Sequence, residues 1–248
     1  MAPTLTMLQM KRLTWIVLLS LLFAGCAIRT PYEEASDPLE PVNRVVYQFN
    51  DGLDRLVLKP VARGYHEYIP PPARTGVRNF FNNIYEPLTI VNNVLQGKPG
   101  QAAGDTMRFG FNTIFGVLGL FDVATGWGLE MHKEDFGQTF GVWGFGEGWY
   151  LVLPLLGPST VRDTAGLPLE YEVDLIALNT SGVTRYAAYS LLLISRRADL
   201  LSASDVLESG SVDPYLQVRE AYRQKRWYDI HDGNPPDEDF SDEELFGD

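Results

Sequence analysis

Residues 108–122 have the sequence RFGFNTIFGVLGLFD, in which 13 consecutive residues carry no charge. As a helix these residues would span ~20 Å, which is short of the ~30 Å hydrocarbon core of a bilayer. A helix that is apolar nearly all round must be buried in protein or in lipid. Two interpretations follow: a core helix of a globular domain, or an interfacial segment beside a membrane.

The rest of the chain body is predicted to be mostly helical. Asp37-Pro38-Leu39-Glu40 is a helix start, with Asp37 as N-cap, and apolar residues at helical spacing follow it as far as Lys59-Pro60. A second helix is expected from Thr75, interrupted by Pro87, and a third piece from Leu88 to Leu95. Two more helices are expected, one over residues 186–201 and one from Asp213-Pro214. No strict alternation of useful length predicts a strand.

The N-terminus has the pattern of an export signal. Lys11-Arg12 precede 11 mostly apolar residues and the small pair Ala24-Gly25. Cys26, the only cysteine of the chain, follows at once and resembles a lipobox cysteine, which becomes a lipidated N-terminus. We therefore expect a signal peptide over residues 1–25 and a lipidated Cys26 followed by a short tether to residue 36.

The charge is concentrated at the C-terminus. The formal net charge is −12, and residues 229–248 hold nine acids and no Lys or Arg. This segment is expected to be a disordered acidic tail, with a single domain over residues 37–228. Net acidity argues against a nucleic-acid binder, and the three histidines show no metal-ligand spacing, so we expect no metal or other cofactor.

A glycine-rich, aromatic stretch occupies residues 135–150. Its composition disfavours both helix and strand, so it is interpreted either as a curved loop that shapes the core or as the wall of a channel. Gly137 and Gly141 form a GxxxG pattern, a weak signal for helix packing.

No catalytic constellation is recognisable, and we expect no enzyme. Gly157-Pro158-Ser159 lacks the second glycine of a nucleophile elbow, and the one cysteine belongs to the lipobox.

Several motifs, in order and over roughly residues 26–228, resemble those of the MlaA (VacJ) lipoproteins. They are Asp37-Pro38-Leu39-Glu40-Pro41-x-Asn43-Arg44-x-x-Tyr47-x-Phe49-Asn50, Asn79-Phe80-Phe81-Asn82-Asn83-x-x-Glu86-Pro87, Arg108-Phe109-x-x-Asn112-Thr113-x-x-Gly116-x-x-Gly119-Leu120-Phe121-Asp122, Asp135-Phe136-Gly137-Gln138-Thr139-x-Gly141, Gly157-Pro158-Ser159-x-x-Arg162-Asp163 and Asp213-Pro214-Tyr215-x-x-x-Arg219.

The resemblance implies an all-α fold: a flattened ring of amphipathic and interfacial helices around a central amphipathic pore, anchored by an N-terminal lipid. It also implies an outer-membrane protein of the inner leaflet that faces the periplasm. Such proteins remove phospholipids misplaced in the outer leaflet and pass them to a soluble periplasmic carrier, beside a trimeric porin. A passive porin-binding scaffold and, less favoured, a lipid hydrolase are the alternatives.

Two groups of site residues are expected. Candidates for the lipid path or pore lining are Asn112, Thr113, Phe136, Gln138, Thr139 and Trp143. Candidates for helix packing or gating are Asn43, Arg44, Phe49, Asn50, Asn79, Asn82, Asn83 and Glu86. Arg44, Arg108 and Arg162 are interpreted either as phosphate ligands or as internal struts that pair with Glu40, Glu86, Asp122 or Asp163, and the second interpretation is favoured.

Overall fold

The computed structural model describes residues 37–204 and 213–236. Cys26, the signal peptide, the tether and most of the acidic tail lie outside the described residues. The elements in chain order are α2 (Glu40–Leu53), η1 (Asp54–Leu58), α3 (Lys59–Tyr68), α4 (Pro71–Leu95), α5 (Pro99–Ile114), α6 (Val123–Gly126), α7 (Phe136–Val142), β1 (Tyr150–Leu153), β2 (Gly157–Thr160), α8 (Val161–Val173), α9 (Leu175–Asn179), α10 (Gly182–Asp199) and α12 (Pro214–Ile230).

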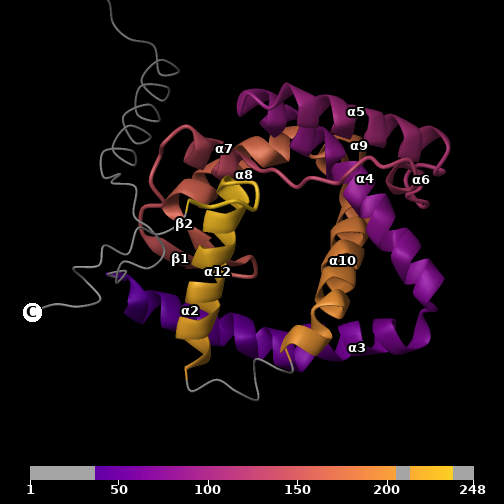
Figure 1. Ribbon diagram of the computed structural model, residues 1–248. Helices are drawn as coiled ribbons and strands as arrows, with labels where there is room; N and C mark the ends of the chain where they lie inside the picture. The colour runs from indigo at the N-terminus through magenta and orange to yellow at the C-terminus, as the bar shows by residue number, and fades with distance from the viewer. Residues whose placement is uncertain (1–36, 205–212, 237–248) are drawn as a thin grey trace, which may run out of the picture.

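The helices form a flattened ring, as the resemblance implied (Figure 1). One edge consists of α2, η1 and α3, and the opposite edge contains α5, α7, α8 and α9. The two edges are joined by α4 and α10, and by α12 together with the β1–β2 hairpin. Within residues 37–204 and 213–236, no helix is both long and apolar enough to cross a membrane.

The first helix differs from the prediction at both ends. It begins at Glu40 with Leu39 as N-cap, because the Asp37 carboxylate has tertiary partners instead of capping the helix. Asp37 accepts hydrogen bonds from Asn43 and from the Tyr215 hydroxyl of α12. At the other end the helix does not stop at Lys59-Pro60. The wider π-turn η1, in which the Lys59 N–H donates to the Asp54 carbonyl, accommodates the proline that would break a regular α-helix.

The interruption expected at Pro87 is also absent. Pro87 lies inside the 25-residue helix α4. Contacts with the neighbouring helix α5 hold α4 on both sides of the proline: Asn83 donates to Thr113 (3.0 Å) before it, and Asn93 donates to Asp105 (2.7 Å) after it. These tertiary bonds offset the hydrogen bond that proline removes.

The apolar stretch at residues 109–121 is not a core helix. Helix α5 ends at Ile114, and a tight turn follows in which Val117 and Leu118 have positive φ. At Gly119, a Cβ atom would lie 2.3 Å from the Asn83 Cβ atom, so only glycine fits there. Large side chains of this turn are exposed, which favours the interfacial interpretation: Ile114, Phe115, Val117, Leu118, Leu120 and Phe121.

The stretch at residues 135–150 is more regular than predicted. Phe136–Val142 form α7, which the glycine content concealed and which Asp135 caps by accepting from the Gln138 N–H (2.8 Å). The small antiparallel hairpin β1–β2 was also missed, with Tyr150 opposite Thr160. Each strand has four residues and β2 contains Pro158, so alternation is too short to detect.

The two C-terminal helices lie where they were predicted, although α10 (Gly182–Asp199) begins four residues before the expected segment and ends two residues before its end. Helix α10 covers most of the expected amphipathic segment, and Asp213 caps α12 by accepting from the Tyr215 and Leu216 N–H groups. Helix α12 continues to Ile230, two residues into the segment assigned to the acidic tail.

Many polar side chains are buried, and many large apolar side chains are exposed. Within the described residues, the largest fully buried side chains are Arg108, Asn92, Asn93, Thr139, Thr160 and Asp105. Apolar clusters are small, for example Phe81, Ile176 and Leu192 between α4, α9 and α10. In water such a distribution would leave much apolar surface exposed, so it favours a non-aqueous environment around the ring.

Asn43 joins α2 to the hairpin and provides a test of this polar interior. Its amide donates to the Tyr150 carbonyl and accepts from the Val152 N–H, both at 2.9 Å. Asn43→Leu leaves both backbone groups unpaired, so we expect the free energy of unfolding to fall by about 2–4 kcal/mol. Gln48→Leu, at an exposed position of the same helix, is the matched control. Thermal unfolding of the detergent-solubilised protein, followed by circular dichroism, compares them; equal melting temperatures would contradict the assignment.

Candidate functional site

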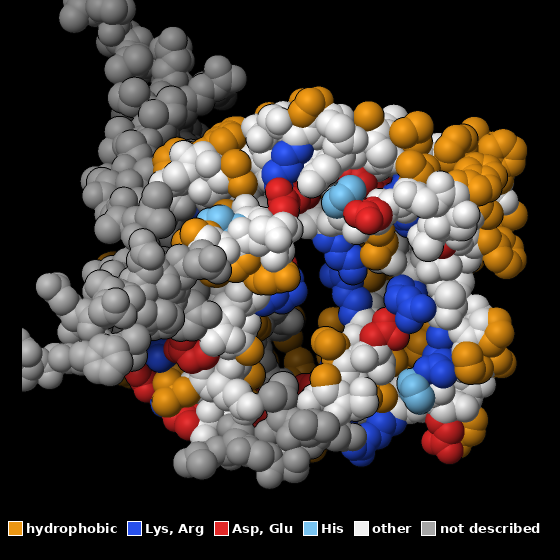
Figure 2. Space-filling model, viewed as in Figure 1, with side chains coloured by type: hydrophobic (Ala, Val, Ile, Leu, Met, Phe, Trp, Pro, Cys, Tyr) orange, Lys and Arg blue, Asp and Glu red, His pale blue; other side chains and the backbone are white. Residues whose placement is uncertain are grey.

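The ring encloses an opening between α12 and α10 (Figure 2). Helix α12 packs on α7 and β2, whereas α10 packs on α3, α4 and α9, so the two helices belong to opposite walls. The segment between α6 and α7 passes over the end of the opening (Figure 1). Hydrophobic and basic side chains both line it, which makes the opening amphipathic (Figure 2).

The outer surface carries apolar side chains that no part of the described chain covers. We call the following residues the apolar rim: Val42, Val45, Phe49, Leu53, Leu56 and Val57 of α2 and η1, the 114–121 turn, and Leu155 and Leu156 at the hairpin tip. Leu56 is 81% exposed and Leu156 is 70% exposed. Exposed apolar surface on this scale marks a membrane or partner contact.

Arg108 fixes one side of the ring from inside. Its guanidinium contacts Glu86 of α4 (3.1 Å) and Asp122 before α6 (3.0 Å), and it donates to the Leu129 carbonyl (2.6 Å). Burial raises the pKa of Glu86 to about 7, although the hydrogen bond and charge of Arg108 oppose the rise. Arg108 therefore holds α4, α5 and the segment after α6 together, and its donors are used within the protein.

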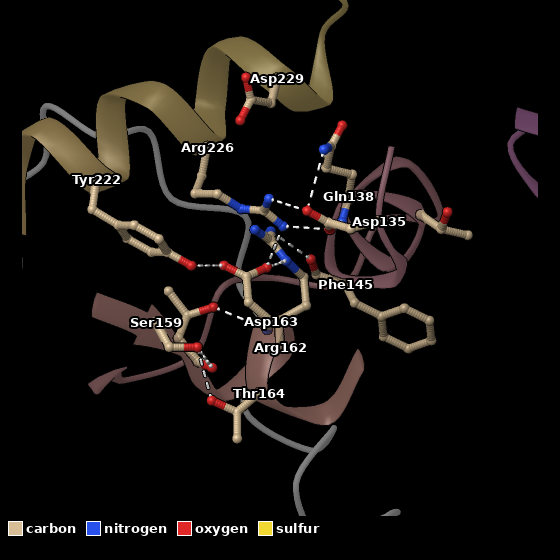
Figure 3. Close-up of polar contacts among 12 residues, drawn as sticks. Asp135, Gln138, Phe145, Ser159, Arg162, Asp163, Thr164, Tyr222, Arg226 and Asp229 are labelled. Atoms are coloured by element: carbon tan, nitrogen blue, oxygen red, sulfur yellow. Dashed lines mark hydrogen bonds and ion pairs between the residues drawn. The ribbon is translucent and has the colours of Figure 1, made fainter. Parts of the chain in front are cut away.

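Arg226 has the same role at the other wall (Figure 3). From α12 it contacts Asp135 at the start of α7 (2.6 and 2.8 Å) and Asp163 in the first turn of α8 (2.9 Å). The Tyr222 hydroxyl donates to the second oxygen of Asp163 (2.6 Å). Burial would raise the pKa of Asp163, but the charges of Arg226 and Arg162 lower it to about 2.

A small cavity of about 120 Å³ lies beside this network, lined in part by Arg162, Arg223 and Arg226. Each of these arginines contacts a carboxylate: Arg162 pairs with Asp163 (3.2 Å), Arg223 with Glu147 (2.7 Å), and Arg226 with Asp135. The positive charges of the arginines that line the cavity are therefore balanced by carboxylates of the protein.

Most of the residues expected to line a pore are inside the protein. Asn112 donates to Asp122 and accepts from the Ala124 N–H, Gln138 donates to the Lys133 carbonyl, and Thr139 donates to Asn92. Thr113 accepts from Asn83, and Phe136 is buried. These contacts place the five side chains in helix packing. Trp143 is half exposed and donates to the Leu95 carbonyl.

Apart from Arg44, the helix-packing candidates fall into three groups. Asn43, Asn50, Asn79, Asn83 and Glu86 each bond to another element, for example Asn50 to Leu153 and Leu155 of the hairpin region. Phe49 is exposed and belongs to the apolar rim instead. Asn82 is half-buried, and no side-chain hydrogen bond of Asn82 is present within the described residues.

The strut interpretation of the three arginines is correct in this structure. Arg44 pairs with Glu40 (2.7 Å) and also with Asp213 (2.7 Å), Arg108 with Glu86 and Asp122, and Arg162 with Asp163.

Arg226 and Tyr222 were missed by sequence reasoning. The available signal was that Asp135 and Asp163 each lie at or near the start of a glycine-containing apolar segment, where a buried carboxylate needs a cation nearby.

The serine nearest to a nucleophile motif has no base beside it within the described residues. The Ser159 hydroxyl contacts the Thr164 hydroxyl (2.9 Å) rather than a base. Within the same residues, no cluster of three or more His, Cys, Asp or Glu could hold a metal ion.

Gly137 and Gly141 form the packing face of α7. A Cβ at Gly137 would lie 2.4 Å from an Asp163 oxygen and 2.6 Å from Arg226 Nη2, and one at Gly141 would lie 2.8 Å from Ile230. We expect Gly137→Ala to lower the free energy of unfolding by about 1–3 kcal/mol, because it displaces the ion pair. Gly104→Ala in α5, where a Cβ meets nothing within 4 Å, is the control and should be neutral or stabilising. Thermal unfolding measures both; a stable Gly137→Ala protein would show that the network tolerates displacement.

Comparisons with known proteins agree with this architecture. A sequence model described as MlaA lipoprotein matches residues 35–229. The proteins named intermembrane phospholipid transport system lipoprotein MlaA from Shigella flexneri and Escherichia coli (strain K12) are each 38% identical over 219 residues, which cover 86% of this chain and 86% of each relative. The protein of the same name from Haemophilus influenzae is 30% identical over 234 residues, 91% of this chain and 93% of the relative.

A solved structure gives the same result for the fold. It comes from work on the structural basis for maintenance of bacterial outer membrane lipid asymmetry, and it is 36% identical to this chain with a TM-score of 0.71. The match covers 79% of this chain and 100% of the solved one. With the family match over the whole helical body, these similarities lead to one conclusion: the chain belongs to the MlaA lipoprotein family.

Proposed function

We propose that this protein is an outer-membrane lipoprotein that removes misplaced phospholipids from the outer leaflet and passes them to a soluble periplasmic carrier. The observation that carries the proposal is an amphipathic opening inside a ring whose outer rim is apolar. The names of its relatives, which refer to phospholipid transport, support the same role.

The apolar rim supports a position within the inner leaflet of the outer membrane. No helix within residues 37–204 and 213–236 could span a membrane, but leucine, valine and phenylalanine are exposed along α2, η1 and the 114–121 turn. The ring gains free energy when these side chains are buried among acyl chains. A lipid on Cys26 would hold the ring at this surface and would leave its other face toward the periplasm.

The opening supports a lipid path. A phospholipid crosses a leaflet slowly because its charged head must leave water, at a large desolvation cost. An opening with basic and polar groups solvates the head while the acyl chains follow apolar surface, which removes most of that cost.

We propose contact with a trimeric porin through part of the rim, which would deliver lipid from the outer leaflet, and release to the carrier on the periplasmic side.

Two alternatives predict different behaviour. A passive porin-binding scaffold needs the fold and the anchor but not the opening. A lipid hydrolase needs an activated nucleophile, and the Ser159 hydroxyl contacts only hydroxyl and carbonyl groups within the described residues.

Surface phospholipid provides the first test. Intact cells are treated with a membrane-impermeant amine reagent, and labelled phosphatidylethanolamine is extracted and quantified. We expect deletion of the gene to raise the labelled fraction, and the wild-type chain, but not Cys26→Ala, to restore it. An unchanged labelled fraction after deletion would favour the scaffold, and free fatty acid released by the wild-type chain would favour the hydrolase.

The rim provides the second test. In full chains carrying Cys26→Ala, which lack the proposed lipid, vesicle flotation reports binding by the ring itself. We expect Leu56→Asp to weaken binding about tenfold or more, since an exposed apolar side chain is replaced by a charge that resists burial in lipid. Gln48→Asp, at an exposed polar position of α2, is the matched control. Equal binding by the two variants would show that this part of the rim faces another protein instead.

A further inference from the structure

Basic residues from four separate segments lie near one another in the ring. Lys133 lies in the segment between α6 and α7, and its side chain is exposed but partly desolvated by the surrounding protein. This desolvation lowers the pKa of Lys133, and the positive charges of Arg196, Lys225 and Arg78 lower it further. Arg196 lies on α10 and Lys225 on α12, the helices of the two opposite walls. Lys133 therefore lies near basic residues of both walls. Figure 2 shows basic side chains on both sides of the opening.

Two of these cations are not neutralised. Lys225 pairs with Asp229 and Arg78 with Asp199 (3.5 Å). Lys133 and Arg196 are both exposed, and within residues 37–204 and 213–236 neither forms an ion pair with a carboxylate. The negative charge of Asp199 acts in the opposite direction and raises the pKa of Lys133.

Arg196 is also held in position. Its guanidinium lies over the Tyr85 ring, 5.2 Å from the ring centroid, so a flat face is fixed while its N–H groups remain available. Burial and the carboxylates of Asp174 and Glu170 raise the pKa of Tyr85, whereas the positive charge of Arg196 lowers it. Burial also raises the pKa of Glu170 to about 7, so this acid is only partly charged at neutral pH.

This arrangement matches the chemistry of a lipid phosphate. A guanidinium binds a phosphodiester through two parallel hydrogen bonds, and an ammonium adds a point charge. A zwitterionic headgroup would also bring its own ammonium close to Arg78, Lys225 and Lys133, where like charges repel. An anionic headgroup such as glycerol phosphate brings no such cation.

We propose that Lys133 and Arg196 form a phosphate-recognition site in the opening, which gives this protein a preference for anionic phospholipids over zwitterionic ones. The inference rests on the proposed function and specifies its substrate class. The sequence motifs did not indicate it, because the two residues lie outside all of them.

The test measures which lipid the purified full-length protein retains. The protein is equilibrated with mixed micelles containing equal amounts of phosphatidylglycerol and phosphatidylethanolamine, and the bound lipids are extracted and quantified by mass spectrometry. We expect an excess of phosphatidylglycerol for the wild type, reduced about five- to twentyfold in the Lys133→Gln, Arg196→Gln double variant. Lys133→Glu should reverse the preference. Arg55→Gln, an exposed cation on η1 that pairs with Asp51, is the control and should leave the ratio unchanged.

The outcomes separate the inference from the proposed function. Retention of both lipids at the same ratio in the wild type and the double variant, with equal melting temperatures, would overturn the inference and leave the conduit intact. Retention of no phospholipid by the wild type would overturn the proposed function as well. Titration with inorganic phosphate separates the two sources of the anion: tight binding of free phosphate, with no lipid preference, would make this a site for a soluble anion and overturn the lipid assignment.

Discussion

Charged side chains buried inside a shell with an apolar exterior are the constraint on which this structure depends. Arg108 and Arg226 each tie two carboxylates from different segments, at distances of 2.6–3.1 Å. Such pairs add little net stability over an apolar core, but removal of one partner leaves an uncompensated buried charge that costs several kcal/mol. The pairs therefore specify which segments meet, and they free the apolar side chains to face outward.

The ring geometry follows from this arrangement. A ring cannot gather its helices around one central hydrophobic core, so each joint needs its own specific contacts. Asn43 and Asn50 join α2 to the hairpin, Arg226 joins α12 to α7 and α8, and Asn83, Glu86 and Asn93 join α4 to α5 on both sides of Pro87. Close approach at Gly137 and Gly119 completes two of these joints, since any side chain there would displace a partner.

The same division of polar and apolar surface connects the fold to the proposed lipid path. The motif residues with polar side chains hold the frame, whereas the cations at the opening lie outside the motifs, on α4, α10, α12 and the segment before α7. Within the described residues, the polar groups of the frame are bonded to one another and to backbone groups, and not to the charged ends of the cations at the opening. Substitutions that change the charge of the opening therefore leave the ring intact. Substrate preference and fold can then be set by different residues.

The sequence by itself predicted the helical class and the cap at Asp213, and it favoured Glu40, Glu86, Asp122 and Asp163 as a set of acid partners for Arg44, Arg108 and Arg162. These features depend on local spacing, on composition and on the family pattern. It did not indicate that Arg44 also pairs with Asp213. Tertiary structure decided the rest. Helices continue through Pro60 and Pro87 because a π-turn and inter-helix hydrogen bonds compensate for the proline residues. Asp37 does not cap α2 because its carboxylate accepts a hydrogen bond from Tyr215 of α12. Asn112, Gln138 and Thr139 bond to groups within the protein, and Lys133 lies near Arg196, because which face of a ring is its inside depends on contacts between separate segments of the chain.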